Sequence, residues 1–204
     1  SRVEFLEKSK TITPEQIISS QEHPDFSVVL QKALISASQT ENKEKHQLLS
    51  RLVAERMKSA PESLLALTSK MACDAIACTT SNQLNLLGLI ANIMYIGPSS
   101  KLSNEQYTGY LQARLRPFSE VRPENLDYVH LEALSCLKFE PFLTRDLKKI
   151  LTDKNQGEFD FDAFKEQPLG KSLTESWEKH HLKSTQLTSI GQMIGVMVSD
   201  QVTG

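Results

Sequence analysis

Three acidic residues at alternate positions, Glu158, Asp160 and Asp162, have the spacing in this chain that comes nearest to a reaction centre. In an extended segment alternate side chains point to the same face, so the three carboxylates would lie together. Three carboxylates on one face can hold Mg²⁺ or Mn²⁺ for phosphoryl chemistry, as in a metal-dependent hydrolase. However, no histidine, lysine or arginine at a diagnostic spacing completes such a site. The favoured interpretation is therefore the polar face of an edge strand.

The same stretch, residues 153–164, also has some of the spacing of a calcium-binding loop. Such a loop needs oxygen ligands at alternate early positions, a glycine at the sharp turn and a bidentate glutamate at its end. If Gly157 occupies the turn, one early ligand is missing and the closing position falls on Ala163. Without the closing carboxylate the site would lose its main charge. We therefore expect a solvated turn whose aromatic side chains reach the core: Phe159, Phe161 and Phe164.

The histidines and cysteines do not form a metal-binding or nucleophilic pattern. His180 and His181 are adjacent, and neighbours on a helix point about 100° apart, so they do not chelate one ion. Two cysteines are five residues apart on one predicted helix, and the third is six residues from His130. We expect all three to be buried as small apolar residues: Cys73, Cys78 and Cys136. The sequence thus predicts no catalytic residue, no metal, no cofactor and no enzymatic activity.

The bulk composition describes a globular protein with no strong charge preference. The chain has 204 residues, of which 39% are hydrophobic and 24% charged, and its formal net charge is -2. Such a charge does not favour nucleic acid as a partner, because phosphate binding usually needs a basic excess. The odd number of cysteines indicates a reducing compartment, and no leader or membrane-spanning run is present, so we expect a cytoplasmic protein. The start at Ser1 leads us to expect a trimmed fragment that lacks an upstream segment.

The central element is predicted to be a helix over residues 81–96. Apolar residues occur at helical spacing on one face and fill most of a second face. A helix that is apolar on most sides is normally buried at the centre of a bundle. Amphipathic segments with helix-capping residues precede and follow it, and few residues connect them. We therefore expect an all-α protein, a multi-helix bundle with neighbouring helices antiparallel.

A change in composition after Gly97 suggests two parts. We expect an N-terminal helical bundle over residues 1–97 and a smaller, mostly helical C-terminal subdomain over residues 98–204, with one continuous domain as the alternative. In the first part, the helix after Pro61 is expected to bury seven residues: Leu64, Leu65, Leu67, Met71, Ala72, Ala75 and Ile76. In the second part, Leu126 and Val129 are expected inside.

The C-terminal third also has some features of a winged helix. Predicted helices at residues 144–152 and 171–181 precede a segment at 183–188 that could form a wing strand. Five side chains would then face a nucleic-acid groove: Lys171, Ser172, Thr174, Lys179 and His180. Against this interpretation, residues 138–183 contain nine basic and nine acidic side chains. Binding to DNA depends heavily on net phosphate neutralisation, so this remains the alternative interpretation.

Three segments carry a resemblance to a known family. They are Pro24-Asp25-Phe26, then residues 45–56 (KHQLLSRLVAER), then residues 81–96 (SNQLNLLGLIANIMYI), and residues 187–191 add a weaker likeness. Together they resemble an uncharacterised family of bacterial all-helical proteins. The resemblance implies a bacterial, cytoplasmic, helical protein, and a role in defence or stress response would suit it. No catalytic or ligand residue is established in that family, so none is transferred.

The sequence therefore favours a module that works by protein–protein contact. We expect a protein assembly or sensor module that binds a protein partner or a second copy of itself, without catalysis of its own. The alternative is a winged-helix-like nucleic-acid-binding protein that uses the C-terminal third. A metal-dependent hydrolase at the carboxylates of residues 158–162 is the third hypothesis.

Overall fold

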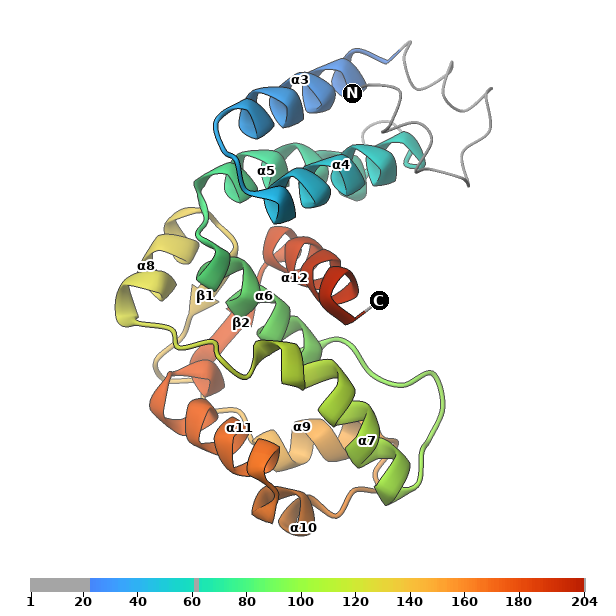
Figure 1. Cartoon of the computed structure of the whole chain (residues 1–204), viewed down its shortest axis with the longest axis vertical. Helices are drawn as coiled ribbons and strands as arrows, with labels where there is room; N and C mark the ends of the chain where they lie inside the picture. Colours follow the sequence, from blue (N-terminus) through green and yellow to red (C-terminus); the bar gives the residue numbers. More distant parts are fainter. Residues whose placement is uncertain (1–22, 61–62, 204) are drawn as a thin grey trace. The chain divides into compact units, whose positions relative to one another are not determined.

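The computed structural model describes residues 23–60 and 63–203 (Figure 1). Ten α-helices, two short 3₁₀ helices and two three-residue strands form this part of the chain, so the expected all-α fold is confirmed. The chain divides into two compact units, residues 1–79 and residues 80–204. The sequence also predicts the end of a helix over residues 1–9 and a helix start at Thr13, and both lie outside the described residues.

Three helices form the described part of the first unit: α3 (Pro24–Ser38), α4 (Lys43–Met57) and α5 (Leu64–Cys78). Each of the three packs against the other two. The side chains of Asn42 and Ser63 accept hydrogen bonds from the first turns of α4 and α5, which fixes where these helices begin. Their shared core is apolar and includes Phe26, Val29, Leu48, Leu52 and Ile76.

An ion pair in the first unit joins two of the segments that carry the family resemblance. The Arg56 side chain on α4 is 1% exposed, and its guanidinium pairs with the Asp25 carboxylate at the start of α3. Arg56 also donates to the carbonyl oxygen of Ser59 at 2.9 Å. Burial raises the pKa of Asp25, but the hydrogen bond and charge of Arg56 lower it by more. The net effect is a pKa below the ordinary range for aspartate, and the pair ties α3 to α4.

The second unit contains the remaining elements. They are α6 (Ser81–Met94), α7 (Asn104–Leu115), the 3₁₀ helix η1 (Arg116–Phe118), α8 (Asn125–Ala133), β1 (Leu137–Phe139), α9 (Leu147–Lys154), α10 (Phe161–Glu166), α11 (Pro168–Lys179), η2 (Leu182–Ser184), β2 (Thr185–Leu187) and α12 (Ser189–Thr203). The strands pair antiparallel, with Lys138 opposite Gln186. A strand thus occupies the expected wing position, but it pairs with the strand before α9 and leads directly into α12.

The predicted central helix is confirmed as α6, which packs along α12 (Figure 1). Glycines permit this close approach. A Cβ atom at Gly195 of α12 would lie 2.5 Å from the Leu87 carbonyl oxygen, and one at Gly88 of α6 would lie 2.9 Å from the Val198 side chain of α12. Contacts of that length are forbidden to ordinary side chains, so neither position has room for a larger residue.

The division between the units falls after Thr79, whereas we expected it near residue 97. The reason is the packing of α6 on α12, which places α6 in the second unit. The interior of α5 also differs from the prediction, since only Ala72, Ala75 and Ile76 of the expected set are buried. Leu126 and Val129 of α8 were expected to be buried in the core, and both are exposed. None of the described helices is both long enough and apolar enough to cross a membrane.

Candidate functional site

The structure separates the three carboxylates that were candidates for a metal site. Asp160 caps the N-terminus of α10, and Asp162 lies in the first turn of that helix, where Lys148 pairs with it at 2.8 Å. Glu158 forms its own ion pair with Lys101 at 2.5 Å. Because α10 begins between the candidate positions, the extended segment that would align them does not exist, and the prediction of a shared face is wrong. Within residues 23–60 and 63–203, no cluster of three potential metal ligands occurs.

The segment with calcium-loop spacing is instead a tight connection between α9 and α10. Asn155 is fully buried, and its amide donates to the Leu102 carbonyl oxygen at 2.9 Å and accepts from the Leu102 N–H at 2.9 Å. This side chain therefore anchors the connection to a distant segment. Gly157 has a φ of +88°, which glycine adopts without strain. As predicted, two of the phenylalanines are buried, Phe161 and Phe164.

The five residues expected to face a nucleic-acid groove lie on or at the end of α11. Lys171 pairs with Glu166 at 3.2 Å, and Lys179 pairs with Glu175 at 2.5 Å. The Thr174 hydroxyl donates to a carbonyl oxygen of its own helix, at Gly170. The remaining two, Ser172 and His180, are half-buried. The exposed lysines therefore share their face with carboxylates, and the expected basic surface is not assembled.

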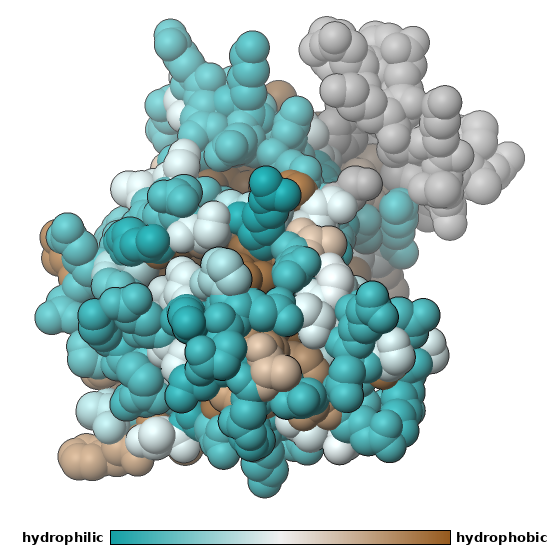
Figure 2. Space-filling model, turned by 60° about the horizontal axis from the view of Figure 1, so that its bottom comes forward, coloured by the Kyte–Doolittle hydropathy of each residue, from teal (hydrophilic) through white to brown (hydrophobic). Residues whose placement is uncertain are grey.

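Figure 2 brings forward the side of the second unit on which α10 lies, and hydrophilic residues cover most of that face. Hydrophobic colour is seen there mainly in recesses between hydrophilic side chains. Acidic and basic residues alternate along α10 and α11, as the pairs described above show. This surface has no continuous field of one sign to attract a polyanion.

Within the part of the chain that the structure describes, the cysteines and histidines show no pairing that would support catalysis. Cys73 and Cys136 are buried, as expected, and burial raises their thiol pKa values to about 12 and about 11. Cys78 is exposed, so the prediction of burial is wrong there, because this side chain lies on the outer face of α5. His130 contacts Gln83 at 3.1 Å and not the nearest cysteine.

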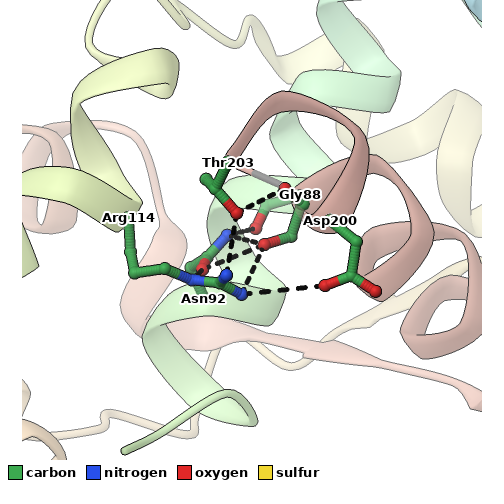
Figure 3. A network of polar contacts seen from close by, with 6 residues as sticks. Gly88, Asn92, Arg114, Asp200 and Thr203 are labelled. Atoms are coloured by element: carbon green, nitrogen blue, oxygen red, sulfur yellow. Dashed lines mark hydrogen bonds and ion pairs between the residues drawn. The ribbon is translucent and has the colours of Figure 1, made fainter. Parts of the chain in front are cut away.

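A buried polar network joins α6, α7 and α12 (Figure 3). The Asn92 amide nitrogen donates to the Gly88 carbonyl oxygen at 2.9 Å and to the Ser199 hydroxyl at 2.8 Å. Its amide oxygen accepts from the Ser199 hydroxyl at 3.1 Å and from Nε of Arg114 at 3.0 Å. An amide side chain has two donors and two acceptor positions, so Asn92 is fully satisfied.

Arg114 completes this network from α7. Its other nitrogens donate to the hydroxyls of Thr203 at 2.7 Å and Ser199 at 2.9 Å, and Asp200 lies 3.9 Å away. Figure 3 shows the guanidinium facing this cluster of side chains. Since its donors are already used by protein atoms, the arrangement serves to hold three helices together and leaves little capacity for a ligand.

Lys154 extends the network at the end of α6. Its Nζ atom donates to the carbonyl oxygens of Asn92 and Ile93, the latter at 3.1 Å. These carbonyls lie in the last turn of α6, where helix carbonyls lack partners, so a cation is favourable there. Burial and the nearby Arg114 charge lower the pKa of Lys154 to about 7. Lys154 therefore caps the C-terminal end of α6, and its pKa is well below the ordinary value for lysine.

The described part of the first unit has an exposed apolar stripe on α5. Leu64, Leu67 and Met71 are 73%, 55% and 52% exposed. Their spacing of i, i+3 and i+7 places them along one side of the helix, as in the contact seam of paired helices. We call these three residues the α5 stripe. Contiguous exposed apolar side chains of this kind mark interaction sites more often than isolated ones do.

The sequence model of one protein family matches residues 3–166. The chain belongs to this family. The family is uncharacterised, so membership defines a relationship and not an activity. The curated proteins and the solved structures contain no match to the chain.

The residues matched by the family model include the Asp25–Arg56 pair, the α5 stripe, and Arg114 and Lys154 near the end of α6. The match stops before α11. The stripe was missed from the sequence because its leucines were assigned to the core. The signal that could have found it is the presence of two apolar sets on one short helix. One set contains Ala72 and Ile76 and is buried, and the other is the stripe.

Proposed function

We propose that this chain is a protein assembly or sensor module that acts by protein–protein contact and carries out no reaction of its own. The observation that supports the proposal is the α5 stripe. Burying an apolar side chain in an interface is favourable by about 25 cal/mol per Å² of surface removed from water. A helix that exposes leucine and methionine at heptad spacing therefore gains stability when a second helix covers them.

The simplest partner is a second copy of the chain. If two α5 helices pair antiparallel about a two-fold axis near Leu67, Leu64 of one copy lies opposite Met71 of the other. Such an isologous contact is self-complementary, which is typical of homodimers. Three exposed side chains form a small contact, so we expect weak, concentration-dependent association.

The proposal places the module in the cytoplasm of a bacterium, with a role in defence or stress response. The supporting observations are the three free thiols, which suit a reducing compartment, and the family resemblance. A bacterial homologue detected in a defence or stress operon would strengthen this part, and one found only in secreted proteins would contradict it.

Light scattering coupled to size exclusion over a wide dilution range tests the proposal. We expect a mass between monomer and dimer that rises with concentration in the wild type. Leu64→Glu should shift the protein to monomer, because a carboxylate replaces an apolar contact. Leu126→Glu is a matched control, since Leu126 is also 73% exposed and also lies in the first turn of its helix, α8. A strict monomer at every concentration, or equal effects of both variants, would contradict association through the stripe.

A further inference from the structure

A groove of about 600 Å³ lies between α7 and the start of α11, in the second unit. Its walls include Gly109, Ala113, Arg116, Ser119, Leu169 and Ser172, and we call it the Arg116 groove. The volume falls in the range of small-ligand sites, about 300–1,000 Å³. The inference below is independent of the proposed assembly function, because the α5 stripe belongs to the other unit.

The polar groups of the groove are available for a ligand. Within the part of the chain that the structure describes, the Arg116 guanidinium and the hydroxyls of Ser119 and Ser172 have no hydrogen-bond or ion-pair partner. This distinguishes Arg116 from Arg114, whose donors are occupied. Among the described residues that line the groove none is acidic, and Arg116 is the single charged one. A guanidinium presents a planar fork of donors that matches a carboxylate.

The rest of the described lining is apolar except for Gln112, whose amide nitrogen donates to the Gln167 side-chain oxygen at 3.1 Å. Pro168 and Leu169 form part of one wall, and Ala113 lies one turn from Gly109 on the other. A Cβ atom at Gly109 would meet no heavy atom within 4 Å, so no packing contact explains a glycine in the middle of α7. The missing side chain leaves the helix backbone open to the groove, where a flat group can lie close to it.

The Arg116 groove therefore combines a largely apolar lining with one cation and two hydroxyls that have no partner among the described residues. We propose that the Arg116 groove binds a small monocarboxylate with a compact apolar body. The carboxylate pairs with the Arg116 guanidinium and accepts from the serine hydroxyls. The apolar body lies between Leu169 and the Gly109–Ala113 side of α7.

The test is a titration of the ¹⁵N-labelled full chain, followed through its backbone amide signals. Benzoate serves as the probe, benzamide as a neutral ligand of the same shape, and inorganic phosphate as an anion without an apolar body. We expect benzoate to shift the amides of Gly109, Ala113 and Ser172 saturably. The affinity of the groove for benzoate should exceed that for benzamide and for phosphate by about tenfold or more. The reason is that only benzoate has both a carboxylate for Arg116 and an apolar ring for the apolar lining.

Two variants separate this site from non-specific anion binding. Arg116→Gln removes the charged partner from an exposed position and should weaken benzoate binding by about tenfold or more, while the other amide signals stay in place. Lys149→Gln removes one exposed positive charge elsewhere in the same unit and should change nothing. Equal binding of benzoate and benzamide, or unchanged binding in Arg116→Gln, would overturn the proposal. So would tighter binding of phosphate, or of a short DNA duplex, at the same amides.

Discussion

Asn92 of α6 and Ser199 of α12 are 107 residues apart in the sequence, and the Asn92 amide donates to the Ser199 hydroxyl at 2.8 Å. Both side chains are buried, at 4% and 0% exposure. The hydroxyl accepts from Asn92 and Arg114 and donates back to Asn92. It thereby sets the register between the first and last helices of the second unit.

Replacing Ser199 by alanine should destabilise the second unit. The change removes one partner from Asn92 and one from Arg114 in a buried setting, and such unsatisfied groups cost about 1–3 kcal/mol. Chemical denaturation measures the loss in the free energy of unfolding. Ser176→Ala is the control, because that half-buried hydroxyl has no partner among the described residues, and it should change stability by less than about 0.5 kcal/mol. Equal stability of both variants would show that the network contributes nothing.

Two helical glycines should respond to alanine with opposite signs. At Gly195 the new Cβ atom would lie 2.5 Å from the Leu87 carbonyl oxygen, so overpacking should destabilise the protein by about 1–3 kcal/mol. At Gly109 the Cβ atom meets nothing within 4 Å, so the better helix propensity should stabilise it by up to about 1 kcal/mol. Melting temperatures of the two variants provide the comparison. A stabilised Gly195→Ala variant would mean that α6 and α12 are not in close contact.

Lys154 should make stability depend on pH in a defined direction. Burial and the Arg114 charge lower its pKa to about 7, whereas the unfolded chain has the ordinary value of about 10.4. Between these values the unfolded state binds more protons, so the free energy of unfolding contributed by this group rises with pH. Denaturation at pH 6 to 9 should show the wild type gaining stability relative to Lys154→Met above about pH 7. Parallel curves for the two proteins would argue against a neutral lysine. The difference between the two proteins isolates Lys154, because every other titratable group is the same in both.

Two ion pairs of α3, Asp25–Arg56 and Lys32–Asp74, should differ in their effect on stability. Asp25→Ala leaves the buried Arg56 guanidinium without its carboxylate, which should cost about 2 kcal/mol, less than for a fully buried pair because Asp25 is partly exposed. Asp74→Ala breaks the exposed pair with Lys32 and should cost less than about 1 kcal/mol. Thermal unfolding of both variants measures the difference. The reverse order would mean that Arg56 finds another partner.

Local features of this fold were predictable from the sequence, and contacts between distant segments were not. The sequence predicts a capping box at Ser103 and Gln106 and a cap at Thr80 or Ser81, and the structure has capping boxes at Ser103 and at Thr80. The central position of α6 followed from its apolar composition. A helix cap depends on adjacent residues, and burial of a uniformly apolar helix depends on composition, so both can be recognised without knowing the rest of the chain.

The functional candidates depended on information that one sequence does not contain. The leucines of α5 fit helical spacing whether they face the core or solvent, and only the positions of α3 and α4 decide which set is buried. Arg114 and Arg116 are two residues apart, yet one is saturated by partners from α6 and α12 and the other faces an open groove. The carboxylates of residues 158–162 were misassigned because Asp160 begins a helix at the point where an extended strand was expected.

The contact between α6 and α12 has a consequence for how the protein forms during synthesis. The first unit pairs helices that follow one another closely in the chain, so its core can form while later residues are still being translated. In the second unit α6 emerges first and its packing partner α12 emerges last. The hydrophobic face of α6 therefore stays exposed, or is bound by a chaperone, until nearly the whole second unit has left the ribosome. Nascent chains stalled before α12 should be the most prone to aggregation.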